Sequence, residues 1–231
     1  MPKASFIIPA HNAQSWVAEC LQSCLDQSVE DIEAIVVNDA STDHTWEIIE
    51  EMAKKDKRII GINLEKNVRA SEARNIAIEK ASSDYMLIQD ADDNALRHRV
   101  RDTLACFEKK NPDLVYGGYV IIDSLSQMEH RYLPEPFNKE RSLKHNTHYI
   151  CHSTLAFRKG VSRNIRYKGG DIDRVGIEDW QFIWDAVTKG YKFAWIKSPL
   201  VYKRMMPGTT VTHRNEEEIL KIKKDYLATL V

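Results

Sequence analysis

The sequence predicts an α/β fold in which helices flank a mostly parallel central sheet. Over the first hundred residues, short apolar runs alternate with segments whose apolar residues recur at helical spacing. The apolar runs are continuous, as in strands that are buried on both faces of a parallel sheet. The chain has 231 residues, 43% of them hydrophobic, and no internal repeat divides it, so we expect one domain with a substantial core.

The predicted elements follow a regular order as far as residue 94. Runs such as SFIIP (5–9) are typical of buried strands, and the helix over 41–55 opens with Ser and Thr caps and has Asp43 in its first turn. Right-handed crossovers place the carboxyl ends of such strands at one edge of the sheet, where ligands bind. The expected order is strand 5–9, helix 16–25, strand 32–39, helix 41–55, strand 59–64, helix 70–81 and a strand from residue 85.

After residue 94 the alternation weakens. The terminal segment carries Ile219, Ile222, Tyr226 and Leu230 on one helical stripe near three lysines. Packing of this helix on the core is the first expectation, and a subunit contact or an anionic lipid surface is the alternative. The other expected elements are a helix over 96–107, a strand or strand pair over 113–123, a polar surface excursion over 124–150, an extended segment at 152–159, a helix over 178–190 and a strand through 192–204.

The composition excludes several classes of partner. With 33 basic and 34 acidic side chains and no run of Lys and Arg, the chain has no track for nucleic acid. Its apolar stretches are too short to cross a bilayer and its N-terminus lacks a signal-peptide core, so we expect a cytoplasmic protein, at most peripheral at the inner face of the membrane. The four cysteines form no CxxC pair and are expected to be buried thiols rather than metal ligands or disulfides.

Three carboxylates lie at the mouth of the predicted fourth strand. In YMLIQDADDN (85–94), an apolar run leads directly into Asp90, Asp92 and Asp93. Like charges this close require a cation, a set of hydrogen-bond donors, or full hydration. The segment therefore predicts either a site for a divalent metal ion or a solvated acidic turn that caps the next helix.

Two further acidic turns have a functional and a structural explanation each. In VVNDASTD, Asp39 and Asp43 bracket a strand-to-helix turn, where a carboxylate accepts hydrogen bonds either from a ribose or base or from the helix itself. In GIEDW, Glu178 and Asp179 adjoin at a predicted helix start beside Trp180. Such a pair can supply a general base, although acidic pairs at helix starts are common on protein surfaces.

A Gly/Pro loop near the C-terminus combines cationic and metal-ligating side chains. RMMPGTTVTHR (204–214) contains Arg204, which would bind a diphosphate as a bidentate partner, and His213, which would ligate a metal ion. A polar surface loop without either role explains the same residues.

The order of these segments resembles the family-2 glycosyltransferases of the GT-A fold. The family pattern has a PxYN turn, a DDGS turn, a DxD metal motif and a late ED base motif; here FIIPAHN, VVNDASTD, DADD and GIEDW follow in that order from about residue 4 to residue 213. The resemblance implies one GT-A domain over 1–231, with a Rossmann-like sheet and a smaller mixed acceptor-side region. Its nucleotide-binding half would be 1–94, its acceptor-binding half 95–215 and its C-terminal helix 216–231.

The resemblance implies a nucleotide-sugar site at the first two turns. Pro9, His11 and Asn12 would line the nucleotide base, and Asp39 would hydrogen-bond uracil or ribose. Arg74, in ASEARN, would lie on the side of the diphosphate. His11 replaces the usual tyrosine, so that base stacking would depend on an imidazole ring.

The resemblance also assigns the metal and the base. Asp90 and Asp92 form the DxD that would bind Mn²⁺ or Mg²⁺ and the ribose, with Asp93 close by. Asp179 would remove the acceptor proton, with Glu178 as its neighbour. Departures from the family pattern are Asn38 and Ala40 in place of the Asp and Gly of DDGS, and Asp185 where many relatives carry an arginine.

The activity that follows is inverting transfer of a sugar from a nucleotide-diphosphate donor, taken to be UDP-linked, to a saccharide or glycolipid acceptor of cell-surface polysaccharide synthesis. A homodimer or a peripheral membrane contact is compatible with the sequence. The alternative is a sugar-nucleotide-binding module without transferase activity, or a subunit that requires a partner. A nucleotidyltransferase is disfavoured because the chain lacks a Gly-rich N-terminal loop, and a phosphate receiver domain is shorter by about a hundred residues.

Overall fold

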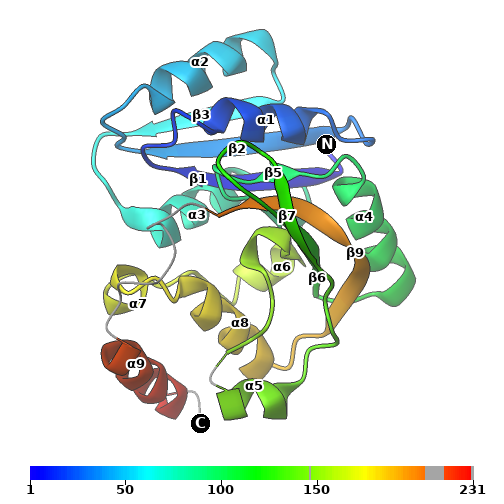
Figure 1. Ribbon diagram of the computed structural model, residues 1–231, viewed down its shortest axis with the longest axis vertical. Coiled ribbons are helices and arrows are strands. Elements are labelled where there is room, and N and C mark those ends of the chain that lie inside the picture. The colour runs from blue at the N-terminus through cyan, green and yellow to red at the C-terminus, as the bar shows by residue number, and fades with distance from the viewer. Residues whose placement is uncertain (146, 206–215, 230–231) are drawn as a thin grey trace.

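The structure is a computed structural model that describes residues 1–145, 147–205 and 216–229 (Figure 1). It confirms the predicted α/β class. The strands are β1 (Ala4–Ala10), β2 (Ile32–Asp39), β3 (Ile59–Leu64), β4 (Tyr85–Ile88), β5 (Asn94–Ala95), β6 (Leu114–Ile122), β7 (Met128–Tyr132), β8 (Ala156–Arg158) and β9 (Phe193–Arg204). The helices are α1 (Val17–Leu25), α2 (Thr45–Lys55), α3 (Arg69–Lys80), α4 (Arg99–Lys110), α5 (Lys139–His145), the 3-10 turn η1 (His152–Thr154), α6 (Lys159–Ser162), α7 (Asp171–Arg174), α8 (Glu178–Thr188) and α9 (Glu216–Ala228).

Within the described residues, one nine-stranded sheet runs through the molecule in the order β3-β2-β1-β4-β8-β6-β9-β5, and β7 pairs with β6. Strands β1 to β4 pair parallel with one another, whereas β8 pairs antiparallel with both β4 and β6. Because the chain leaves β1 for β2 on one side and returns to β4 on the other, the strand order reverses between β1 and β4. Open α/β sheets bind ligands at such a reversal, beyond the carboxyl ends of the strands.

The apolar side chains of the central strands alternate between two cores. Phe6 and Ile8 of β1 pack in one cluster with Leu21 of α1, and Ile7 packs in the opposite cluster with Ala77 of α3. Helices α1, α2 and α4 therefore cover one face of the sheet, and α3 and α8 cover the other (Figure 1). Each fully buried side chain of this size stabilises the fold by about 1.5–3 kcal/mol, so the strands that carry the site are held rigidly.

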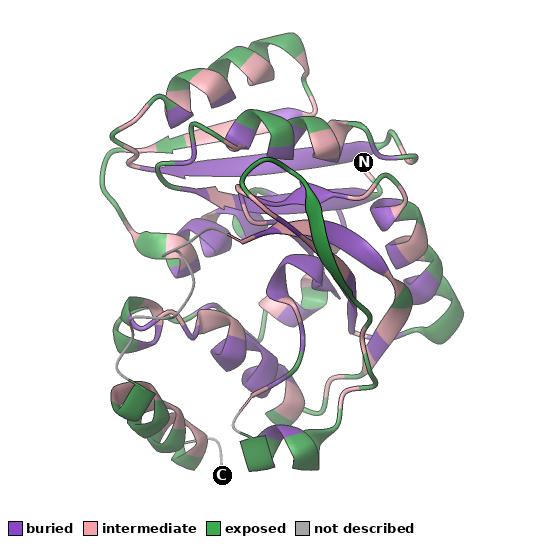
Figure 2. Cartoon of the chain, in the orientation of Figure 1, coloured by how far each residue is buried: buried purple, intermediate pink, exposed green. Residues whose placement is uncertain are grey.

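Several predicted boundaries change in the structure. Helix α2 begins at Thr45, because the Asp43 side chain accepts hydrogen bonds from the backbone N–H and the hydroxyl of Thr45 and so ends the preceding turn. The excursion over 124–150 contains β7 and α5 rather than surface loop alone, and the segment at 152–159 divides into η1 and β8. The sequence did not predict these elements because their residues show no apolar pattern. All five residues of β7, for example, are exposed (Figure 2).

The C-terminal helix packs on the body of the protein, as first expected. Four residues of α9 contact a cluster formed by Trp180 and Trp184 of α8, Ile172 of α7, and Val175 and Ile177 between these helices: Ile219, Ile222, Tyr226 and Leu227. Leu230, expected on the same stripe, lies outside the described residues. Of the helices described, none combines the length and the apolar character that a membrane span requires. Cys20, Cys24 and Cys106 are buried, as predicted, whereas Cys151 is only partly buried; all four are free cysteines.

Close packing at Gly118 gives a test of this architecture. A Cβ added to Gly118 in β6 would lie 2.4 Å from the backbone oxygen of Tyr132 in β7, a backbone atom that cannot move aside alone. We expect Gly118→Ala to lower the free energy of unfolding by about 1–3 kcal/mol, measured by urea denaturation followed by circular dichroism. The matched control is Gly160→Ala, where an added Cβ meets no atom within 4 Å; equal stability of the two variants would contradict the packing.

Candidate active site

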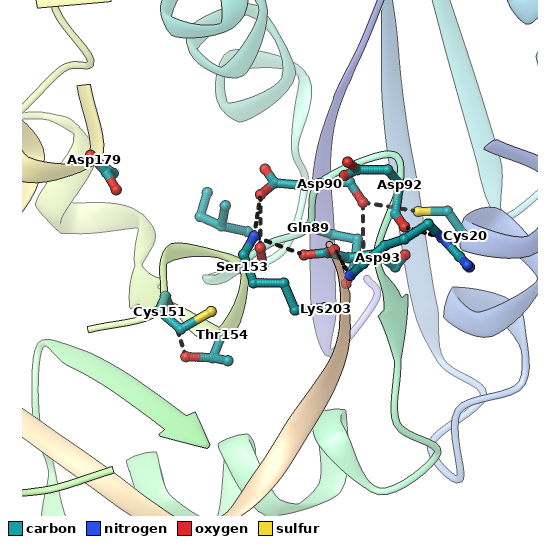
Figure 3. A network of polar contacts seen from close by, with 12 residues as sticks. Cys20, Gln89, Asp90, Asp92, Asp93, Cys151, Ser153, Thr154, Asp179 and Lys203 are labelled. Carbon is teal, nitrogen blue, oxygen red and sulfur yellow. Dashed lines mark hydrogen bonds and ion pairs between the residues drawn. The ribbon is translucent and has the colours of Figure 1, made fainter. Parts of the chain in front are cut away.

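The three carboxylates of the acidic turn converge at the carboxyl end of β4 (Figure 3). Asp93 is fully buried, whereas Asp90 and Asp92 are partly exposed. The turn follows the strand at which the order of the sheet reverses, which explains why a buried strand ends in acidic residues rather than in a solvated loop.

Asp90 is held by donors from three distant segments. Its Oδ1 accepts a hydrogen bond from the Arg74 guanidinium at 3.0 Å, its Oδ2 accepts one from the Ser153 hydroxyl at 2.7 Å, and the Lys203 ammonium lies 3.9 Å from Oδ2. Burial by itself raises the pKa of Asp90, but the charges of Arg74 and Lys203 outweigh it and hold the pKa well below its usual range. Asp90 is therefore ionised at neutral pH.

Asp93 has a different environment. Its Oδ1 accepts the backbone N–H of Arg204 at 2.8 Å, and its buried Oδ2 has no hydrogen-bond partner, although Lys203 Nζ lies 3.6 Å away. Burial raises the pKa of Asp93 to about 7, and the neighbouring carboxylates of Asp90 and Asp92 add to this effect. Lys203 is thus the protein's own counter-ion for the acidic turn.

Arg74 joins the acidic turn to the start of helix α8. Its guanidinium donates to Asp90 with one nitrogen and to the Oε1 of Glu178 with the other, both at 3.0 Å. Only 6% of the Arg74 side chain is exposed, and the pKa of Arg74 is raised by the two carboxylates although burial opposes this. Glu178 is therefore committed to an ion pair, which leaves its neighbour Asp179 as the acidic group that faces open space.

Asp179 lies beside a histidine whose tautomer the structure defines. The backbone N–H of Ile150 donates to Nδ1 of His148 at 3.0 Å, so the ring proton is on Nε2, which lies 3.6 Å from Oδ2 of Asp179. Burial alone would raise the pKa of Asp179, but the contact with His148 outweighs it and lowers the pKa. The carboxylate is therefore ionised at neutral pH, as a proton acceptor must be.

Two cavities meet at Arg74 and Asp90. The first, which we call the strand-end pocket, has a volume of about 320 Å³, and its lining includes Pro9, His11, Asn12, Trp16, Asp39, Arg74, Asp90 and Asp92. The second, the Asp179 cavity, has a volume of about 600 Å³, and its lining includes Arg74, Asp90, Tyr132, His148, Tyr149, Glu178, Asp179 and Lys203. A larger cavity of about 1290 Å³ between α1 and β7 is lined by none of the predicted site residues, so it is not the candidate active site.

The first two turns of the sheet are connected to each other at the strand-end pocket. His11 Nδ1 lies 2.8 Å from the backbone oxygen of Asp39, and the Asn12 side chain accepts the backbone N–H of Thr42. Asp39 is buried and accepts the backbone N–H of Val68, so it also fixes the third turn. The structure therefore brings Pro9, His11, Asn12 and Asp39 to one wall of one pocket.

The departures in the second turn have a structural explanation. Ala40 has a φ of 51°, in the left-handed region that favours glycine, so alanine at this position carries backbone strain. Asn38 is buried, donates to Asn63 at 2.7 Å and accepts from the Ser41 hydroxyl at 2.5 Å. Its amide thus keeps the hydrogen bonds of the turn without a charge.

The third departure, Asp185, fastens the C-terminal helix. This buried carboxylate accepts hydrogen bonds from Tyr226 of α9 at 2.6 Å and from Gln181 at 2.7 Å, with Lys168 at 3.7 Å. Asp185 therefore acts on the packing of α9 against α8 and does not line either cavity.

The structure does not support Arg204 as a ligand of a diphosphate. Its side chain is fully buried and donates to the backbone oxygens of Asp92 and Asp123 and to the carboxylate of Glu19, and it stacks on the Trp16 ring. These contacts occupy the hydrogen-bond donors of the guanidinium inside the protein, so Arg204 supports the acidic turn from its buried side. His213, predicted as a metal ligand in the same loop, lies outside the described residues.

Sequence reasoning missed Lys203, Ser153 and His148. His148 lies in the predicted surface excursion over 124–150, Ser153 lies in the predicted extended segment at 152–159, and Lys203 is the penultimate residue of β9. No motif distinguishes them, because their contacts with Asp90, Asp93 and Asp179 join residues far apart in the chain. The one local signal is that Lys203 adjoins Arg204, a residue that sequence reasoning did select.

The donor set suits a hard divalent cation. Asp92 borders the strand-end pocket beside Asp90, and carboxylate oxygens are the ligands that Mg²⁺ and Mn²⁺ prefer. In the described part of the chain no three side chains of His, Cys, Asp or Glu form a ready-made cluster. Mg²⁺ does not require one, since it commonly binds through one or two carboxylates together with substrate phosphates. Burial and the charge of Asp90 raise the pKa of Asp92, so a cation here would be favourable.

Comparison with known proteins agrees with this geometry. Residues 5–166 match the family profile described as glycosyl transferase family 2. The chain is 31% identical over 160 residues to the putative teichuronic acid biosynthesis glycosyltransferase TuaG of Bacillus subtilis, covering 68% of this chain and 63% of that protein. It is 28% identical over 219 residues to the UDP-Glc:alpha-D-GlcNAc-diphosphoundecaprenol beta-1,3-glucosyltransferase WfaP of Escherichia coli, covering 95% of this chain and 84% of that protein.

Among solved structures, TarS 1-349 of S. aureus in complex with UDP-GlcNAc superposes with a TM-score of 0.74 at 21% identity, covering 99% of this chain and 71% of that chain. This similarity confirms the GT-A fold that the sequence predicts. The chain spans about half the length of the first curated relatives it matches.

The ion pairs of Arg74 give a test of the site's construction. Arg74→Met leaves Asp90 and Glu178 without their shared cation, and breaking such a buried pair should lower the free energy of unfolding by about 3 kcal/mol near pH 7. Since Arg74 lowers the folded-state pKa of Asp90, its contribution is present above the unfolded-state pKa of about 3.9 and is lost as the pH falls through the folded-state value. Urea denaturation at several pH values measures this.

The matched control is Lys54→Met, which breaks the exposed pair of Lys54 with Glu50 and should cost less than about 0.5 kcal/mol at any pH. The ion-pair bridge would be contradicted if Arg74→Met lowered the free energy of unfolding no more than Lys54→Met does. It would also be contradicted if the loss for Arg74→Met grew as the pH fell.

Proposed function

We propose, from the premise that this chain belongs to glycosyl transferase family 2, that it transfers a sugar from a UDP-sugar to an acceptor hydroxyl with inversion at the anomeric carbon. The observation that carries the proposal is that the strand-end pocket and the Asp179 cavity meet at Arg74 and Asp90. A donor in the first cavity and an acceptor in the second would meet at that junction.

The strand-end pocket supports binding of the nucleotide. Its wall of Pro9, His11 and Asn12 offers an imidazole ring and an amide to a base, and Asp39 offers a carboxylate to uracil or ribose. The two turns that supply these residues are fixed to each other, and to the third turn at Val68, by hydrogen bonds between side chains and backbone, so the pocket is preformed. Preformed polar groups bind without an added cost of ordering.

The diphosphate would lie toward the acidic turn. Asp92, with Asp90, would hold Mn²⁺ or Mg²⁺, which when bound would supply positive charge to the diphosphate as it departs. Asp93 is buried behind these two carboxylates. It would therefore lie farther from the metal ion and the diphosphate and would support the turn. Arg74 and Lys203 neutralise Asp90 from its other sides, so the crowded carboxylates are stable before the donor binds.

Asp179 would act as the general base. It lines the second cavity, is ionised, and has Nε2 of His148 3.6 Å from its Oδ2. It would take the proton of the acceptor hydroxyl while that oxygen attacks the anomeric carbon from the face opposite the diphosphate, and a single displacement of this kind inverts the centre. Glu178 would hold the base in position through Arg74.

The names of the relatives support a saccharide or glycolipid acceptor in cell-surface polysaccharide synthesis. One relative is named for teichuronic acid biosynthesis, and another for transfer of glucose to a diphosphoundecaprenol-linked sugar. The aromatic rings of Tyr132 and Tyr149 at the Asp179 cavity are surfaces on which a sugar ring can stack.

The base is tested by Asp179→Asn, which keeps the shape of the side chain but removes its capacity to accept a proton. General-base catalysis contributes about 10²- to 10⁴-fold, and turnover measured by UDP release with an active acceptor should fall by that factor. The affinity for UDP, measured by calorimetry, should not change. Asp171→Asn, at an exposed aspartate of α7, is the control; near-normal turnover of the Asp179 variant would refute the assignment, and UDP binding without any turnover by the wild type would favour a non-catalytic sugar-nucleotide-binding module.

The metal site is tested by Asp92→Ala. In calorimetric titrations with UDP, added Mn²⁺ should tighten binding to the wild type and should have little effect on the variant, because a ligand for the ion has been removed. Asp84→Ala is the control, since Asp84 lies exposed at the amino end of the same strand. Identical Mn²⁺ dependence in the Asp92 variant and the wild type would place the ion elsewhere.

A further inference from the structure

Strand β7 has one open edge. It pairs with β6 alone among the described residues, and all five of its side chains are exposed (Figure 2). The exposed row of backbone N–H and C=O groups on such a strand is a template for pairing with another chain. Proteins commonly block such edges with proline, with charged side chains of one sign, or with a covering segment. The sequence of β7, MEHRY, contains no proline, and its two charged residues, Glu129 and Arg131, are of opposite sign.

Apolar side chains gather along the same hairpin. Leu125, Met128 and Leu133 are 75%, 72% and 56% exposed, and Tyr132 is also exposed. Half of the eight large hydrophobic side chains that are exposed in the described residues therefore lie within nine consecutive positions. Clustered exposure of this kind marks an interaction surface more often than scattered exposure does.

We propose that a second copy of this chain pairs antiparallel with β7 across a two-fold axis, with His130 opposite its own counterpart. In this register Glu129 lies directly opposite Arg131 of the partner subunit, and the two-fold axis generates the same pair a second time. Met128 lies opposite Tyr132 of the partner subunit. Directly opposed residues of antiparallel strands share a face, so these pairs are in contact distance.

Charge selects this register over its neighbours. A shift that centres the axis on Glu129 places two glutamates opposite each other, and a shift to Arg131 places two arginines opposite each other, which is destabilising. An axis at Met128 leaves both charges opposite uncharged side chains, and an axis at Tyr132 places Glu129 opposite another acidic residue, Glu135 of the partner subunit, and Arg131 opposite an uncharged one. Only the register centred on His130 pairs each acid with a base, which is the self-complementarity that a two-fold interface requires.

The interface would border the Asp179 cavity. Tyr132 lines this cavity and stacks on Tyr119 with ring centroids 4.9 Å apart. Met128 of the partner subunit would pack beside Tyr132 at the rim, so each subunit would extend the wall of the other's cavity. The proposal does not depend on the reaction that the chain catalyses.

Sedimentation velocity over about 1 to 300 µM protein, the range in which small interfaces associate, tests the proposal. The wild type should show a reversible monomer–dimer equilibrium. Glu129→Arg and Arg131→Glu should each weaken the dimer at least about tenfold, since each replaces two attractive pairs by two repulsive ones. The control is Glu47→Arg on α2, an exposed position away from β7, which should leave the equilibrium unchanged.

Two rescue experiments make the test specific to this register. The double variant Glu129→Arg/Arg131→Glu restores both pairs and should dimerise like the wild type, and an equimolar mixture of the two single variants should form a heterodimer. A monomeric wild type throughout the range, single variants that dimerise as well as the wild type, or failure of both rescues would overturn the proposal.

Discussion

The two ion pairs of Arg74 are the contacts on which the site depends. A buried guanidinium spans from Asp90 at the end of β4 to Glu178 at the start of α8, two residues 88 positions apart in the chain. An arginine can do this because its planar fork offers parallel donors that remain charged when buried. The bridge joins the carboxylates of the acidic turn to the helix that carries Asp179, and it engages Glu178 so that Asp179 is the carboxylate of the pair that remains outside it.

A second cation completes the electrostatic balance. Lys203, on the strand that returns along β6, lies between Asp90 and Asp93, while the backbone of Arg204 donates to Asp93. The acidic turn is thus neutralised from within the protein on its buried side and remains open toward the strand-end pocket at Asp92. This arrangement answers how three carboxylates can persist within four residues: each has a different environment, and Asp92 is the one available to an incoming cation.

The sequence predicted the residues of the candidate site that lie at strand ends. It did not predict the residues whose contacts join segments far apart in the chain. Strand-end residues such as Asp39 and Asp90 could be recognised because continuous apolar runs identify parallel strands and their carboxyl ends share an edge. Lys203, Ser153 and His148 could not, because their roles arise from the order of strands in the second half, where β8 is antiparallel and β9 returns beside β6. Arg204 was selected for its charge, yet burial against Trp16 and Glu19 directs that charge inward.

The central claim is that donor and acceptor react at the junction of two cavities that Arg74 holds together. A crystal structure of the protein with UDP-sugar and Mn²⁺ tests it most directly. The account predicts the uracil against His11 and Asp39, the ion on Asp92, and the Asp179 carboxylate facing the anomeric carbon from the side opposite the diphosphate. A nucleotide seated elsewhere, or a sugar whose anomeric carbon faces away from Asp179, would contradict it.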